Sequence, residues 1–74
     1  MGLLNHQEIT FTQAAIILLE TGGSIIFTAQ NFKNVEEPGF EFEIKDFKEL
    51  CDEYKLLGID YYNIKLWVPN EHYS

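Results

Sequence analysis

The residues from Phe40 to Ile44 alternate between apolar and acidic side chains, and the period changes directly afterwards. The run Phe-Glu-Phe-Glu-Ile is typical of a strand with one buried and one exposed face. The apolar residues that follow recur at helical spacing: Phe47, Leu50, Cys51, Tyr54 and Leu57. We therefore expect a strand that leads directly into an amphipathic helix. Asp46 is suited to cap this helix with Glu49 at its third position, and Gly58 is suited to end it.

The sequence before this strand predicts one helix. Thr10 and Gln13 have the spacing of a capping box, in which each side chain accepts a hydrogen bond from the other residue's backbone. We expect the helix to run from about Phe11 to Glu20 and to stop at Gly22. The segment 1–8 is expected to be a loose lead-in.

Two further segments have the composition of strands. Ser24–Asn31 and Tyr61–Val68 are rich in β-branched and aromatic residues. In the second of them, alternate residues from Tyr62 to Val68 are expected to face inward, and Tyr61 and Trp67 outward. Pro69 should end that strand, and the tail 70–74 is expected to be loose.

These elements predict an α+β fold in a single domain, 1–74. The expected order is α-β-β-α-β, with a three-stranded antiparallel sheet in the order 2-1-3 and both helices on one face. The Phe40–Ile44 strand would then be an edge strand. A chain of 74 residues has a small core, so a partner or a second copy is expected to add stability.

Eight of the twelve acidic residues lie between Glu36 and Tyr54, in a chain with no arginine and a net charge of −7. Seven of them are predicted to contact a partner: Glu36, Glu37, Glu41, Glu43, Glu49, Asp52 and Glu53. Their spacing, about 6.8 Å along a strand and about 6 Å along a helix turn, resembles the charge spacing of a nucleic-acid strand. The alternative is that these carboxylates only keep the chain soluble and protect a sheet edge from pairing.

Other classes of function find little support in the sequence. His6 and His72 lie near the ends of the chain, so we expect no enzyme, no cofactor and no metal site. The acidic balance disfavours direct binding to nucleic acid or to a membrane. A single cysteine and the lack of a signal peptide favour the cytoplasm. Cys51 is expected to be a buried structural thiol.

Apolar side chains outside the expected core suggest self-association. Ile16 lies outside the buried stripe of the first helix, and Tyr61 and Trp67 lie on the open face of the sheet. We expect these residues to form a homodimer contact or an apolar anchor for a partner.

In length, charge and expected order of elements, the chain resembles small acidic phage-encoded proteins that inhibit host DNA-handling proteins. Among these it is similar to the staphylococcal phage inhibitor of the bacterial sliding clamp. The resemblance implies a dimer in the basic DNA channel of the clamp, which arrests replication in the host cytoplasm. It involves no motif and therefore assigns no residue. An antitoxin, or an inhibitor of a nuclease or of a CRISPR complex, would use the same mechanism on another target. A structural or assembly module that binds through apolar faces is the rival hypothesis.

Overall fold

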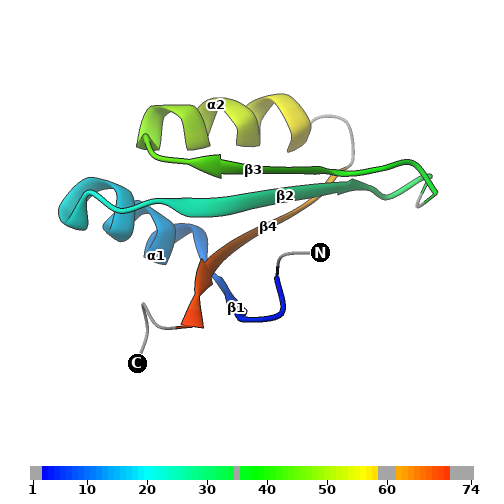
Figure 1. The fold of residues 1–74 in the computed structure, drawn as a ribbon. Coiled ribbons are helices and arrows are strands. Elements are labelled where there is room, and N and C mark those ends of the chain that lie inside the picture. The colour runs from blue at the N-terminus through cyan, green and yellow to red at the C-terminus, as the bar shows by residue number, and fades with distance from the viewer. Residues whose placement is uncertain (1–2, 35, 59–61, 71–74) are drawn as a thin grey trace.

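The computed structural model describes residues 3–34, 36–58 and 62–70. In this part of the chain, helices cover one face of a four-stranded antiparallel sheet in the order β1-β4-β2-β3 (Figure 1). The strands are β1 (His6–Ile9), β2 (Ile25–Asn31), β3 (Phe40–Ile44) and β4 (Tyr62–Pro69). The helices are α1 (Phe11–Ile16), its π-helical continuation η1 (Ile17–Thr21), and α2 (Phe47–Gly58).

The expected three-stranded sheet of order 2-1-3 is wrong, because the sheet has a fourth strand. Strand β1 pairs antiparallel with β4, with His6 opposite Pro69 and Ile9 opposite Leu66. It lies largely within the segment that we expected to be a loose lead-in. The three expected strands are neighbours, as β3-β2-β4, and β1 extends the sheet beyond β4. The order of elements in the described residues is therefore β-α-β-β-α-β.

The first helix begins with the predicted capping box. The Thr10 hydroxyl accepts a hydrogen bond from the Gln13 amide at 3.1 Å, and the Gln13 side chain accepts one from the Thr10 amide at 2.8 Å. From Ile17 onward the helix continues as the π-helix η1 and no longer as an α-helix. The Ile17 carbonyl there accepts hydrogen bonds from the Thr21 hydroxyl and the Gly23 amide. Gly22 then ends the helix in the left-handed conformation, with φ of 70°.

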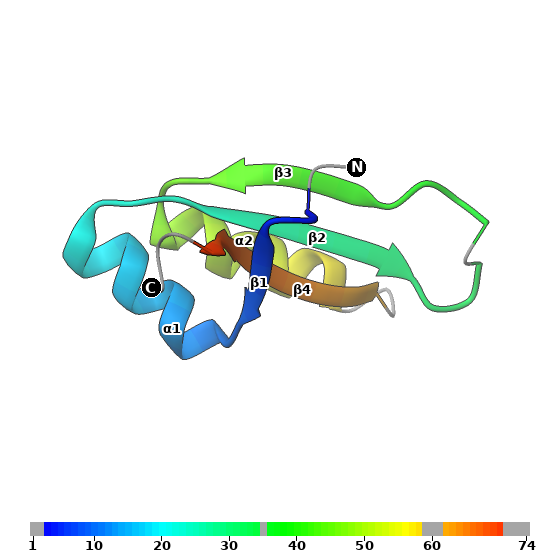
Figure 2. The same cartoon turned by 60° about the horizontal axis from the view of Figure 1, so that its bottom comes forward.

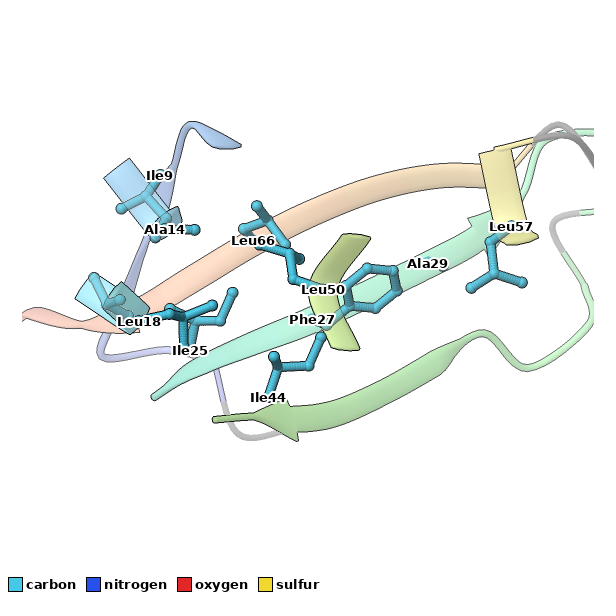
Figure 3. Packing of buried hydrophobic residues seen from close by; sticks show 11 residues of the cluster. Ile9, Ala14, Leu18, Ile25, Phe27, Ala29, Ile44, Leu50, Leu57 and Leu66 are labelled. Atoms are coloured by element: carbon cyan, nitrogen blue, oxygen red, sulfur yellow. The ribbon is translucent and has the colours of Figure 1, made fainter. Parts of the chain in front are cut away.

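The core lies between the helices and one face of the sheet (Figure 3). Alternate residues of β2 are buried: Ile25, Phe27 and Ala29. Ile44 of β3 and Leu66 and Val68 of β4 join them, and α2 contributes Leu50 and Leu57. The Phe11 ring of α1 lies edge-on to Phe47 and Tyr54 of α2, at centroid distances of 5.9 and 5.0 Å. Both helices therefore cover the same face. No helix of the described residues covers the other face, which we call the open face.

The second helix begins directly after Asp46, whose carbonyl accepts a hydrogen bond from the Leu50 amide at 3.2 Å. It ends at Gly58, as predicted. None of the helices in the described ranges is both long enough and apolar enough to cross a membrane.

Candidate protein-interaction surface

Strand β3 places two predicted contact residues on the open face of the sheet. Phe42 and Ile44 pack on the core side, so Glu41 and Glu43 point to the other side, and both are exposed. They lie opposite Thr28 and Ile26 of β2. Their positions are about 6.8 Å apart along the strand, which gives two carboxylates in a fixed row.

The two carboxylates of β3 differ in their contacts. Glu43 accepts a hydrogen bond from the Ser24 hydroxyl at 2.7 Å and lies 3.9 Å from the Lys45 ammonium group. No such contact is seen at Glu41 among the described residues. Glu43 is thus partly oriented by its neighbours, and Glu41 is available to a partner.

The loop between β2 and β3 extends this acidic row. Glu36 and Glu37 are exposed. The Glu36 amide donates to the Asn34 side-chain oxygen at 3.2 Å. The Glu37 amide donates to the Asn34 carbonyl at 3.2 Å, and the Glu37 carbonyl accepts from the Gln30 side chain at 2.7 Å. Gly39 closes the hairpin, where a Cβ atom would lie only 2.5 Å from the Ala29 carbonyl oxygen. Only glycine fits such a close approach of the two strands. We call Glu36, Glu37, Glu41 and Glu43 the hairpin carboxylates.

The remaining predicted contact residues lie on the other side of the sheet. Helix α2 exposes Glu49 and Asp52, and Glu53 is half-buried. Asp52 forms an ion pair with Lys48, at 3.3 Å. Because α2 packs on the core face (Figure 1), these residues do not share one flat surface with the hairpin carboxylates. The acidic set is divided between two sides of the molecule.

The open face has an apolar centre between two acidic edges. Trp67 of β4 lies opposite Ile26 of β2 on one side and Glu8 of β1 on the other. Since Ile26 also lies opposite Glu43, one row across the sheet reads Glu8, Trp67, Ile26, Glu43. Glu8 was not among the predicted contact residues, because it belongs to the strand that the sequence pattern did not reveal.

Trp67 is less available to a partner than we expected. It is half-buried, and its ring N–H donates to the Thr28 hydroxyl at 2.9 Å. An open hollow of about 380 Å³ lies nearby on the same face, lined by residues that include Leu3, Thr28, Glu41 and Lys65. Tyr61, the other aromatic residue predicted here, lies outside the described residues. Ile16 and its neighbour one turn on, Leu19, are exposed to 47% and 64%.

Two titratable side chains lie at the edge of the core. Burial raises the pKa of the Tyr54 hydroxyl above its ordinary value of 10.0, and the negative charge of Glu8 raises it further. Cys51 is free and half-buried rather than fully buried. Within the described ranges, no three histidine, cysteine or acidic side chains gather as they would around a metal ion.

No family model, no curated protein and no solved structure matches this chain.

Proposed function

We propose that this protein is a non-enzymatic inhibitor that binds a basic, DNA-handling host protein through its acidic surface. The observation that carries the proposal is the row of hairpin carboxylates, which are exposed on strand β3 and on the loop before it. Lys45 forms an ion pair with one of them, Glu43, at 3.9 Å. A partner whose surface normally binds phosphates offers the lysines and arginines that this row lacks.

The charge distribution favours binding over simple solubility. Eight acidic residues between Glu36 and Tyr54 repel one another, and this repulsion lowers the stability of the free protein. A basic partner relieves the repulsion on binding and is steered toward the acidic surface from a distance. Like DNA, such a surface exchanges its counterions for the partner's cationic groups, so the affinity depends on salt.

A bacterial sliding clamp is the first target to test. The division of the acidic set between the hairpin and α2 favours a partner that surrounds the protein, since a flat partner would reach only one side. A basic channel has this shape. The observed order of elements differs from the expected one, so the resemblance to the clamp inhibitor now rests on size and charge. The proposed site of action is the bacterial host cytoplasm.

The protein is proposed to act as a homodimer through α1 and η1. No charged residue lies between Phe11 and Leu19, and Ile16 and Leu19 are exposed on this segment. Two copies can meet there without bringing their acidic rows together, and apolar burial then stabilises the contact.

The second candidate is an assembly module that binds through apolar surfaces. It is favoured by the exposed large side chains outside the acidic row, which include Leu19, Phe32 and Leu56. This function predicts binding that is nearly indifferent to salt, because apolar contacts are not screened.

Capture of partners from a bacterial lysate, followed by elution in a salt gradient and mass spectrometry, separates the two functions. The proposed inhibitor releases a DNA-binding or DNA-encircling protein at moderate salt. The Glu41→Lys variant should capture much less of it. The Asp46→Lys variant is the matched control, since it makes the same charge change at an exposed position that is neither a predicted contact residue nor part of the proposed dimer contact. A partner retained through high salt by all three proteins contradicts the proposal.

A further inference from the structure

Strand β3 is an unpaired edge of the sheet. Among the described strands it pairs with β2 alone, with Ile25 opposite Ile44 and Ala29 opposite Phe40. Figure 2 shows β3 along the outer side of the sheet, with α2 behind β2 and β4. In an antiparallel pair, every second residue directs its amide and carbonyl away from the partner strand. Strand β3 therefore offers backbone donors and acceptors to a further strand.

A second copy of the same strand is a poor occupant of this edge. If two β3 strands paired antiparallel about Phe42, Glu41 of each would lie opposite Glu43 of the other. Like charges directly opposite one another destabilise a strand pair. The two carboxylates thus disfavour self-pairing in this register, and they favour a strand of opposite charge.

We propose that β3 binds an extended segment of the partner protein with lysine or arginine at alternate positions, as an added antiparallel strand. This inference rests on the proposed function, because it states how the basic partner engages the hairpin carboxylates. Two independent features support it: the unpaired backbone of the edge, and the alternation of carboxylates with the spacing of strand residues. Addition of a strand to a sheet edge is a general mode of peptide recognition.

The geometry assigns a role to each position of the added strand. Residues opposite Glu41 and Glu43 project on the open face, with Cβ atoms about 5 Å from those of the glutamates. Basic side chains there form charge-assisted hydrogen bonds. The residue between them projects on the core side, beside the half-buried ring of Phe42, which stacks on Phe27 at 5.0 Å. That position favours an apolar side chain.

Three synthetic peptides test the inference: one of alternating lysine and valine, one with the same composition but the lysines in one block, and the alternating peptide N-methylated at every second residue. Binding is measured by NMR on the intact protein, from chemical shifts and amide hydrogen exchange of β3. We expect the alternating peptide to bind at β3 and to slow exchange there, but not at β1, the other edge. The peptide with the lysines in one block loses charge contacts, and the N-methylated peptide loses backbone hydrogen bonds. Each of them should therefore bind about tenfold more weakly than the alternating peptide, or worse.

A charge-reversed variant provides the second readout. Glu41→Lys/Glu43→Lys should lose the lysine–valine peptide and bind an alternating glutamate–valine peptide instead, which also shows that the variant is folded. Equal binding of all three peptides overturns the inference, since charge alone then suffices. Binding of the alternating peptide at a place other than β3, or no binding of it at all, also overturns the inference. None of these results affects the salt-sensitive capture of a partner, so the proposed function is judged separately.

Discussion

Leu50 and Leu56 lie on the same helix, α2, but differ in their exposure to solvent. Leu50 is completely buried between α2 and the sheet, whereas Leu56 is 62% exposed. Burial of a leucine side chain contributes roughly 1.5–3 kcal/mol, so Leu50 is a main determinant of stability. Leu56 is available for contacts with another molecule.

Replacement of Leu50 by alanine should lower the free energy of unfolding by about 2–5 kcal/mol, because it leaves a cavity in the core. The matched Leu56→Ala variant should change it by about 0.5 kcal/mol or less, as is usual for exposed positions. Urea denaturation followed by circular dichroism measures both. Similar losses in the two variants would contradict the burial seen in the structure.

Tyr54 makes stability depend on pH in the alkaline range. Its pKa is raised in the folded protein, first by burial and then by Glu8. The folded state therefore holds this proton more tightly than the unfolded state. The contribution of Tyr54 is fully present below pH 10.0, the ordinary value, and is lost as the pH rises through the folded-state pKa.

We accordingly expect the wild-type protein to lose more stability above pH 10.0 than a Tyr54→Phe variant, which has no hydroxyl to titrate. Glu8→Gln should lower the pKa of Tyr54 toward its ordinary value, because a negative charge is removed. Thermal unfolding across this range measures stability, and the difference in tyrosinate absorbance between wild type and Tyr54→Phe measures the pKa. Identical alkaline profiles for wild type and Tyr54→Phe would contradict this account.

At the scale of elements, local patterns predicted the helices and three strands but not β1. The alternation in Phe40–Ile44, the Thr10–Gln13 capping box and the glycines at 22 and 58 are signals within a few residues, and each corresponds to an observed boundary. Strand β1 has four residues, of which Ile9 alone is buried. Its pairing depends on the free edge of β4, which lies far away in the sequence. A local pattern carries no information about such a contact.

The candidate site shows the same limit. The exposed carboxylates of β3 and α2 followed from periodicity. Their division between two sides of the sheet did not, because it depends on how α2 packs. The hydrogen bond from Trp67 to Thr28 also joins strands distant in sequence, and it explains why this ring is held on the sheet.

Removal of residues 1–8 tests whether β1 is part of the folded sheet. We expect the shortened protein to lose about 1–3 kcal/mol of stability, since several cross-strand pairs with β4 disappear. Amide hydrogen exchange in β4 should become faster at the residues that face β1. Unchanged stability and unchanged exchange in β4 would support the original expectation of a loose lead-in instead.

At the scale of the whole molecule, the hairpin carboxylates and the proposed dimer contact lie on different layers. The hairpin carboxylates belong to the sheet side, whereas Ile16 and Leu19 are exposed on the uncharged segment 11–19 of the helix layer. A protein with this arrangement can bind a second copy through one region and a basic partner through the other.

The Ile16→Glu/Leu19→Glu variant should therefore be monomeric, because two new charges per chain oppose apolar association. Analytical ultracentrifugation over a range of concentrations measures this. The variant Glu41→Lys should keep the wild-type association state, since β3 is not the proposed dimer contact. A wild-type protein that stays monomeric at every concentration would contradict the proposed dimer.

The affinity of the protein for a purified bacterial sliding clamp, measured over a series of salt concentrations, tests the central claim most directly. We predict that the logarithm of the affinity falls steeply with the logarithm of the salt concentration. Glu41→Lys should weaken binding about tenfold or more and flatten this slope, while Asp46→Lys should behave nearly as wild type. If the clamp does not bind, the same series is measured with the DNA-handling protein captured from lysate. Affinity that is independent of salt and equal for all three proteins would contradict the claim that the acidic surface carries the binding.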